Sequence, residues 1–398
     1  MRIAFVGGFA FSPKGTMQAR AFPLGAELVR RGHQVTIFLT PYDNPDDSGR
    51  EWTKAGVRIC NLRTGSSSRA YPRLLVGLWK AIGDYQPQLT HIFKPKGFAG
   101  AIASFLLMKG GNNIVVDCDD WEGWGGWNDV KPYPWLLKEF IDRQERWLMR
   151  RAPAVTVASR ALNDRVSALR NATDDVFYVP NGVASSEAAY PHEAAGCGSQ
   201  AAVRRELDLP EGPLILYSGH FEPGEDAMFF CRSAVPVAER NHASIVLVGD
   251  GPDIDEVRKF FSERRCGSVH FFPRLPHEQF LKVVYACDVA TFPCPDTALN
   301  RSKCSARVID YMMMGKPVLM SAVGQAGEYL VDGESGMLVP PGDENAFGRK
   351  LQLLLEDSEL RARLGRNAQH RIRQNFSWSG APLQQCLAAY EHLAAKQQ

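Results

Sequence analysis

The chain has 398 residues, of which 45% are hydrophobic and 23% are charged, and its formal net charge is +2. This composition excludes a disordered chain, and so small a net charge does not indicate a nucleic-acid partner. Because 398 residues exceed what one ordinary hydrophobic core accommodates, the length predicts two domains.

Strands and helices alternate through the first half of the chain. We predict strands at residues 2–6, 34–39, 57–61, 89–93, 113–117, 154–158 and 176–179, and helices at 19–31, 71–85 and 97–108. Alternation of this kind predicts a parallel sheet that is covered by helices on both faces.

The first predicted strand ends at Gly7 and Gly8. The sequence that follows, GGFAFSPKG, lacks the GxGxxG spacing of dinucleotide-binding folds, which disfavours a nicotinamide or flavin site. Gly7 and Gly8 indicate either a tight turn or a ligand that approaches the carboxyl end of this strand closely. Both are therefore candidate ligand-binding residues.

The alternation restarts in the second half, after a stretch rich in Ala, Ser and Gly. We predict strands at 214–217, 244–248, 269–272, 289–292 and 317–321, and helices at 227–239, 255–264, 277–286, 306–314, 344–374 and 380–396. The chain is thus predicted to be an α/β protein with two Rossmann-like domains that face each other across a cleft. The predicted parts are an N-terminal domain 1–183, a linker or mobile segment 184–205, a C-terminal domain 206–375, and a last helix 376–398 that is free to pack back on the N-terminal domain.

Residues 300–318, NRSKCSARVIDYMMMGKPV, read as a basic loop that enters a helix. Backbone N–H groups at a helix N-terminus, with cations beside them, favour an anion such as a diphosphate. Asp310 on the same helix is suited to accept hydrogen bonds from a ribose. The alternative is an ordinary buried helix with a basic end. The candidate anion-binding residues are Ser302, Lys303, Cys304, Ser305, Ala306 and Arg307.

The nine cysteines show neither CxxC nor Cys/His spacing, which favours a reducing compartment over a disulfide framework or a zinc site. The N-terminal sequence MRIAFVGG has no basic n-region and no cleavable apolar segment, and no apolar run is long enough to span a membrane. We therefore expect a cytoplasmic protein, with peripheral contact at a membrane left open. Four arginines at 143, 146, 150 and 151 surround a Trp-Leu-Met sequence; a solvated charged face is favoured there over a lipid-binding helix.

Several segments, in the expected order, resemble the family 4 glycosyltransferases of the GT-B fold. They are RGHQV at 31–35, PNGV at 180–183, LVGDGP at 247–252, DVATFP at 288–293, DYMMMGKPVL at 310–319, EYLVDGESGMLVPPG at 328–342 and FSW at 376–378. The resemblance implies transfer of a sugar from a nucleotide-sugar to an acceptor hydroxyl with retention of anomeric configuration. It implies no metal and no cofactor other than the nucleotide-diphosphate-sugar as co-substrate. The donor would bind mainly to the C-terminal domain, and the acceptor, which is a glycan, a lipid or a small molecule, mainly to the N-terminal one.

The chain departs from the family at the places that usually meet the donor diphosphate. After Gly219, the usual Arg and Lys are replaced by His220 and Glu225, and the usual pair of glutamates falls on Ser302 and Asp310. Either Arg307, Lys303 and Arg301 supply the missing charge, or the protein is a degenerate homologue that binds its ligand but turns over poorly. A nucleotide-sugar epimerase of the same fold is a further alternative. The remaining donor-site candidates are Gly219, His220, Arg274 and Glu328.

The segment DCDDWEGWGGW follows a predicted strand of the N-terminal domain, and the family's catalytic-region His falls on Asp119. Asp119 or Asp120 could orient an acceptor hydroxyl. His91, at the end of the neighbouring strand, is the third catalytic candidate, with a purely structural role as the alternative. The tryptophans of this segment could line an acceptor pocket or fill the core of the loop.

Overall fold

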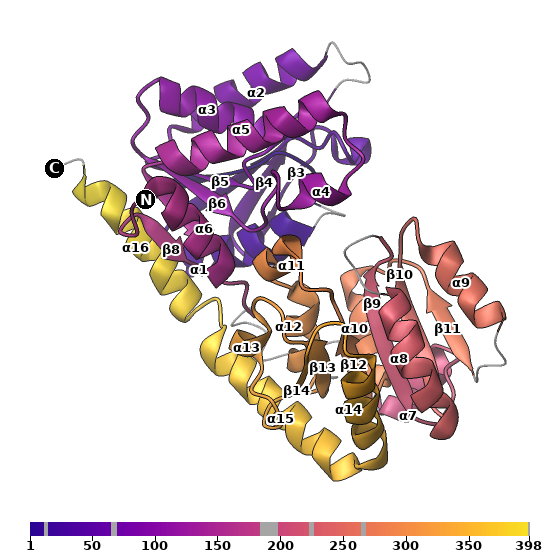
Figure 1. Cartoon of the computed structure of the whole chain (residues 1–398). Helices are drawn as coiled ribbons and strands as arrows, with labels where there is room; N and C mark the ends of the chain where they lie inside the picture. Colours follow the sequence, from indigo (N-terminus) through magenta and orange to yellow (C-terminus); the bar gives the residue numbers. More distant parts are fainter. Residues whose placement is uncertain (12–14, 65–69, 184–197, 223–226, 264–267, 397–398) are drawn as a thin grey trace. The chain divides into compact units, whose positions relative to one another are not determined.

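The computed structural model describes residues 1–11, 15–64, 70–183, 198–222, 227–263 and 268–396. The chain forms two compact units. Unit 1 consists of Met1–Ala184, Ser302–Cys304 and Trp378–Gln398, and unit 2 of Ser185–Arg301 and Ser305–Ser377 (Figure 1). Most of the predicted linker, residues 184–197, lies outside the described residues.

Unit 1 is built on an eight-stranded sheet with the order β3-β4-β2-β1-β5-β6-β7-β8. The strands are β1 (Arg2–Gly7), β2 (Gln34–Leu39), β3 (Glu51–Lys54), β4 (Val57–Asn61), β5 (Leu89–Phe93), β6 (Ile114–Cys118), β7 (Ala154–Val157) and β8 (Val176–Tyr178). All neighbours pair in parallel except β3, which the sequence did not predict and which pairs antiparallel with β4. Ala55 and Gly56 make the hairpin turn between β3 and β4, with φ of 48° and 77°; two positive φ values are what a tight two-residue hairpin loop requires.

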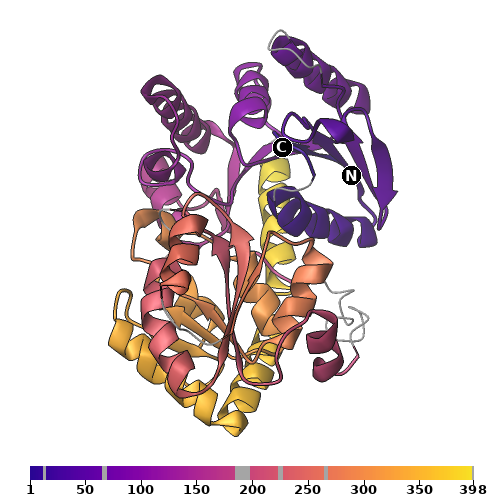
Figure 2. The same cartoon turned by 90° about the vertical axis from the view of Figure 1, so that its right-hand side faces the viewer.

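Helices cover both faces of this sheet, as predicted. The helices α2 (Ala70–Tyr85), α3 (Gly97–Met108), α5 (Trp135–Arg151) and α6 (Arg160–Arg170) connect successive parallel strands and form one layer in that order (Figures 1 and 2). The helices α1 (Phe22–Arg30) and α16 (Ala381–Ala395) pack on strands of the same sheet from the other side. The short elements η1 (Met17–Ala21), η2 (Pro45–Asp47) and α4 (Trp127–Val130) complete the unit.

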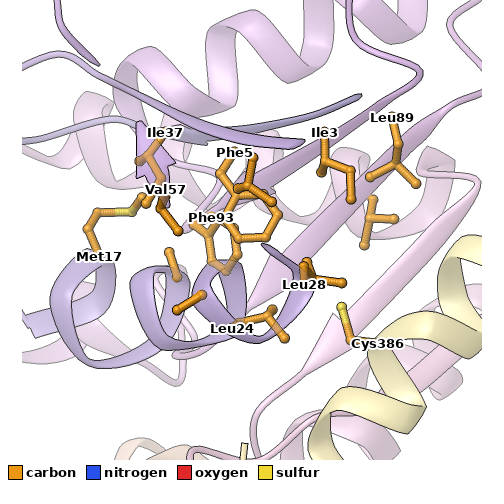
Figure 3. Packing of buried hydrophobic residues seen from close by; sticks show 14 of the residues in the cluster. Ile3, Phe5, Met17, Leu24, Leu28, Ile37, Val57, Leu89, Phe93 and Cys386 are labelled. Carbon is orange, nitrogen blue, oxygen red and sulfur yellow. The ribbon is translucent and has the colours of Figure 1, made fainter. Parts of the chain in front are cut away.

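The core of unit 1 lies between β1 and its neighbours on one side and α1 and α16 on the other. β1 reads RIAFVG and is buried along all but its first residue, as expected for a central parallel strand. Leu24 and Leu28 of α1 point toward Phe5 and Phe93 of the sheet, and Cys386 brings α16 to the same cluster (Figure 3).

Unit 2 is built on a six-stranded, wholly parallel sheet with the order β11-β10-β9-β12-β13-β14. The strands are β9 (Leu214–His220), β10 (Ser244–Asp250), β11 (Val269–Phe272), β12 (Val289–Phe292), β13 (Val318–Ser321) and β14 (Met337–Val339). The helices are α7 (Gln200–Glu206), α8 (Ala227–Arg240), α9 (Ile254–Ser262), α10 (His277–Ala286), α11 (Ala298–Ser302), α12 (Ala306–Met313), α13 (Ala326–Tyr329), α14 (Glu344–Glu356) and α15 (Ser358–Asn375). The predicted α/β class with two parallel-sheet domains is confirmed.

The long helix predicted at 344–374 is two helices. Asp357 separates α14 from α15, and its side chain accepts a hydrogen bond of 2.8 Å from the backbone N–H of Leu360. An Asp in this position satisfies an N–H that the helix itself leaves without a partner, so it starts a new helix rather than continuing the old one. No helix among the described residues is long and apolar enough to cross a membrane.

Candidate functional site

The carboxyl ends of β9 and β10 form a glycine-rich edge in unit 2. Gly249 and Gly251 have φ of 144° and 147°. A Cβ on Gly249 would lie 1.9 Å from the carbonyl oxygen of Gly219, so a side chain there would force the two strand ends apart. The backbone N–H of Phe221 donates to the carbonyl of Asp250 over 2.8 Å and locks the two turns together. Gly219 is therefore fixed at an edge where parallel α/β sheets bind ligands.

His220 stands at this edge with its ring between two carboxylates. Its Nδ1 lies 2.7 Å from the carbonyl oxygen and 3.0 Å from Oδ1 of Asp250, and its Nε2 lies 3.6 Å from Oε2 of Glu222. The side chain is 47% exposed. His220 is thus oriented by neighbouring acids and open on one side. Glu225, the other departure from the family pattern, lies outside the described residues.

Arg307 reaches the same edge from α12. Its Nη1 donates to the carbonyl of Ser218, and its guanidinium carbon lies 5.0 Å from the centre of the Phe292 ring. These contacts hold the cation across the carboxyl ends of β9 and β12. A guanidinium held in this place puts a positive charge at the edge, and its planar group has the geometry that pairs with phosphate oxygens.

The N-terminus of α12 is suited to an anion. Ala306 begins the helix and Ser305 is its N-cap, whose side chain makes no capping hydrogen bond within the described structure. The first turn contains Arg307 and no acidic residue. No acidic side chain in the first turn of α12 therefore offsets the positive end of the helix dipole.

Asp310 lies one turn further along α12, and the structure pairs it with a residue that the sequence did not single out. Nε2 of His277, at the start of α10, lies 3.1 and 3.2 Å from the two oxygens of Asp310. The hydroxyl groups of Tyr311 and Ser218 lie 2.5 Å apart and link α12 to β9 by a hydrogen bond. The position of His277 directly after Pro276, at a helix start, was the available signal, but nothing in it pointed to Asp310.

The other predicted anion-binding residues are engaged in different places. Arg301 forms a two-pronged ion pair with Asp296, with distances of 2.6 and 2.7 Å. Ser302, Lys303 and Cys304 belong to unit 1, where the Lys303 ammonium lies 5.1 Å from the centre of the Trp127 ring. Among the three predicted cations, Arg307 is the one that lies against β9.

Arg274 and Glu328 flank this edge of the unit 2 sheet. Arg274 is exposed in the loop after β11, and Glu328 is half-buried on α13, which follows β13. Gly324 in the loop before α13 has a φ of 55°, and a Cβ there would lie 2.6 Å from the carbonyl oxygen of Arg301. The loop that carries Glu328 is therefore in close contact with the chain that leads to α12.

In unit 1, Asp119 and Asp120 lie directly after β6, at the same edge as the end of β5. Oδ2 of Asp119 accepts a 2.7 Å hydrogen bond from the Thr16 hydroxyl, and Asp120 forms a 3.0 Å ion pair with Lys94. Burial raises the pKa of Asp120, and the nearby Asp119 and Glu122 carboxylates add to this effect while Lys94 opposes it. Asp120 is thus a carboxyl group whose proton affinity is increased by its surroundings.

His91 lies inside the sheet rather than at a strand end. It is fully buried, its Nδ1 lies 2.9 Å from the Tyr390 hydroxyl, and its Nε2 lies 3.1 Å from the Thr156 hydroxyl. Burial, with the nearby charge of Arg20, lowers the pKa of His91 well below its ordinary value. In this position His91 joins α16 to the sheet as a neutral residue and has no surface open to a ligand.

The Trp-rich segment folds around its first tryptophan. Trp121 is fully buried, and the Arg165 guanidinium carbon lies 3.7 Å from the centre of its ring. The Glu145 carboxylate accepts hydrogen bonds from the backbone N–H groups of Glu122 and Gly123. Trp121 therefore fills the core of the loop, which is the structural alternative, whereas Trp127 is only half-buried.

Close packing within unit 1 accounts for Gly7 and Gly8. A Cβ on Gly7 would lie 2.7 Å from the Met17 sulfur, and a Cβ on Gly8 would lie 3.0 Å from backbone atoms of Lys96 and Ala99. Other parts of the same chain therefore pack against both glycines, with side chains at Gly7 and backbone at Gly8. Among the described residues, no group of His, Cys, Asp and Glu side chains has the arrangement of a metal site.

Two family models match the chain in succession. Residues 15–182 match the glycosyl transferase 4-like domain, and residues 212–357 match the glycosyl transferases group 1. The chain belongs to the family 4-like glycosyltransferases of the GT-B fold. This confirms the resemblance that the sequence motifs indicated.

Individual relatives of this glycosyltransferase are distant. It is 24% identical over 267 residues to glycogen synthase of Mycobacterium tuberculosis. The matched region is 65% of this chain and 58% of that enzyme. It is 22% identical to the GDP-mannose-dependent alpha-(1-6)-phosphatidylinositol monomannoside mannosyltransferase of Mycolicibacterium smegmatis, over 95% of this chain and 96% of that one. The structure resembles sucrose-phosphate synthase from Thermosynechococcus elongatus with a TM-score of 0.75 and 21% identity, covering 99% of each chain.

Proposed function

We propose that this protein transfers a sugar from a nucleotide-sugar to an acceptor hydroxyl, with retention of anomeric configuration and without a metal ion. The observation that supports the proposal most is the placement of Arg307. Its guanidinium is anchored at the carboxyl end of β9 by Ser218 and Phe292, and it occupies the first turn of α12. The mannosyltransferase relative, whose name specifies GDP-mannose, supports a nucleotide-sugar donor.

The diphosphate of the donor would bind at this edge. When the bond between sugar and diphosphate breaks, negative charge develops on the departing oxygen, and fixed donors that face it lower the barrier. Arg307 would donate to the phosphate oxygens in a forked manner, and the backbone N–H groups at the start of α12 would add further donors. Gly219 lets the backbone approach the phosphates, and His220 adds a donor at the position where relatives carry an arginine.

Asp310 would hold the ribose of the donor. Its two carboxylate oxygens can accept hydrogen bonds from two neighbouring hydroxyls. His277 already lies 3.1 and 3.2 Å from these oxygens, so it fixes the carboxylate in one orientation. Glu328 and Arg274, on loops at the same edge of the unit 2 sheet, would contact the sugar and the base.

The acceptor would bind to unit 1 at the end of β6. Asp120, whose pKa is raised chiefly by burial, can accept or share the proton of an acceptor hydroxyl. Asp119 would orient that hydroxyl; its Oδ1 is buried and accepts no hydrogen bond from the described residues. Lys94 offsets part of the repulsion between the two carboxylates through its ion pair with Asp120.

The proposal is tested by incubating the purified protein with a panel of nucleotide-sugars and an extract that contains glycans and lipids, with EDTA present. Release of nucleoside diphosphate that requires the extract supports a metal-independent transferase, and NMR of the product reports the anomeric configuration. Binding of a nucleotide-sugar without release of nucleoside diphosphate would instead support the degenerate homologue. Conversion of the sugar without an acceptor would indicate an epimerase.

A further inference from the structure

Helix α5 is apolar on two opposite sides. Its inner side is buried through Ile141, Leu148 and Met149. On its outer side Leu136 is 75% exposed and Phe140 is 56% exposed, and Trp147 follows at 36%. Residues spaced by four and seven positions lie in one row along a helix, so these three side chains form a continuous exposed stripe.

The outer side of α5 is also basic. Arg143 lies on the same stripe with its side chain 79% exposed, and Arg150 and Arg151 are exposed in the last turn. Two of the acids of the helix, Asp142 and Glu145, are turned inward, where they accept hydrogen bonds from the backbone of the loop at 122–124. The third acid, Glu139, is 26% exposed and lies 3.4 Å from Arg143, so the exposed Arg150 and Arg151 give the outer side its surplus of positive charge.

The neighbouring helices extend this surface. Val76 and Trp79 of α2 are 60% and 50% exposed, and Met108 at the end of α3 is 70% exposed. The ring of Trp79 meets Phe105 of α3 edge to face at 5.9 Å, so the apolar surface continues from α2 to α3. The helices α2, α3 and α5 lie side by side in the same layer of unit 1 (Figures 1 and 2). Arg73 and Lys80 of α2 are exposed cations, and so is Lys109, which directly follows α3.

We propose that this outer face of α2, α3 and α5 docks unit 1 on a lipid surface that carries anionic headgroups. Soluble proteins seldom leave so many large apolar side chains exposed on adjacent elements. Trp, Phe and Leu interleaved with Lys and Arg are the residues of helices that lie in the interface between water and lipid. The rings and aliphatic side chains enter the headgroup region, while the cations remain beside the anionic headgroups.

Charge distinguishes a lipid surface from a second copy of this chain. A symmetric dimer would place the same face of both copies together, so Arg143, Arg150 and Arg151 of one copy would face the same cations of the other. Anionic lipid supplies the opposite charge, and a fluid surface accommodates apolar side chains that lie on three helices. The proposal concerns unit 1 alone and does not depend on the identity of the donor or the acceptor.

The test is binding of the full chain to vesicles of phosphatidylglycerol and phosphatidylcholine, measured by co-sedimentation and by the blue shift of Trp fluorescence. We expect the wild type to bind these vesicles, to release them at high salt, and to bind pure phosphatidylcholine weakly. The variant Phe140→Ser/Trp147→Ser removes two side chains of the stripe, and its affinity should fall by about tenfold or more. Arg143→Glu/Arg150→Glu should abolish the preference for anionic lipid.

Leu353→Ser is the matched control, because Leu353 is a comparably exposed apolar side chain, at 45%, on α14 of unit 2. It should bind vesicles like the wild type. Circular dichroism checks that each variant is folded. Equal binding by the wild type and Phe140→Ser/Trp147→Ser would overturn the proposal, and so would absence of binding to anionic vesicles. Self-association that the same two substitutions abolish, without any effect of lipid, would assign the face to a second copy instead.

Discussion

Replacement of Arg20 by Met should destabilise unit 1 more than any ordinary surface substitution. Arg20 is 2% exposed and makes a two-pronged ion pair with Asp117, with Nε and Nη2 at 2.7 and 2.6 Å from its oxygens. Its Nη1 also donates to the carbonyl of Val179 and to Asn181, at 2.7 and 3.1 Å. The side chain thus joins η1, the end of β6 and the chain after β8.

The expected cost follows from what the substitution leaves behind. Arg20→Met buries the Asp117 carboxylate with only the Thr156 hydroxyl, at 2.6 Å, as a side-chain partner among the described residues. Removing one partner of a buried ion pair costs about 3–5 kcal/mol, because the remaining charge is desolvated without compensation. For a unit of this size, that corresponds to a fall in Tm of roughly 6–20 °C.

The assay is urea denaturation followed by intrinsic fluorescence. All eight tryptophans belong to unit 1, so the signal reports on that unit alone. Arg58→Met is the control, since its ion pair with Glu51 is 55% and 52% exposed and is worth at most about 1 kcal/mol. A loss of stability in Arg20→Met no larger than in Arg58→Met would refute the reasoning. The double variant Arg20→Met/Asp117→Leu should recover part of the loss, because it removes the unpaired carboxylate.

Two further substitutions test other parts of the structure. Gly249→Ala places a Cβ 1.9 Å from the carbonyl oxygen of Gly219 at a φ of 144°. It should destabilise unit 2 by more than about 2 kcal/mol, as measured by calorimetry. Gly212→Ala is the control and should have little effect, because the atom nearest to its Cβ is 3.4 Å away. Burial raises the pKa of Glu145 from 4.5 to about 8 although backbone N–H groups oppose this. Folding therefore favours the protonated form of Glu145. The free energy of unfolding of unit 1 should be unaffected by this group below pH 4.5 and should fall by a few kcal/mol as the pH rises to about 8. Glu145→Gln should flatten that dependence, and an unchanged slope would contradict the assignment.

Much of the fold was predictable from local patterns. The parallel strands are apolar runs, and β1, β9 and β10 have a glycine as their last or second-last residue. Helices of the predicted type lie between them. The hairpin strand β3 was not predicted, because Glu51–Lys54 carries mostly polar side chains at a sheet edge and gives no apolar signal. The break at Asp357 was equally hidden, since its capping role depends on a single side-chain hydrogen bond.

The sequence predicted which residues belong to the candidate site better than it predicted which of their side chains contact each other. The sequence pointed to Arg307 and Asp310 on one helix. It did not indicate that His277, 33 residues away, would meet Asp310, or that Asp296 would hold Arg301. Nor did it indicate that His91 would be buried against Tyr390, 299 residues later in the chain. Such pairings depend on which elements the fold brings together, and no local pattern contains that information.

The most direct test of the central proposal is the affinity of nucleotide-sugars for unit 2 of the intact chain, measured by isothermal titration calorimetry. The donor is first identified by a thermal-shift screen, because a ligand that binds the folded state raises the Tm. We expect Arg307→Gln to weaken its binding by about 1.5–3 kcal/mol, the scale of hydrogen bonds to a charged group. Arg258→Gln is the matched control, since that guanidinium also lies over a phenylalanine, Phe271 at 4.5 Å, but on α9. Equal affinity in the wild type and Arg307→Gln, or an equal loss in both variants, would contradict the assignment of the diphosphate to the β9 edge.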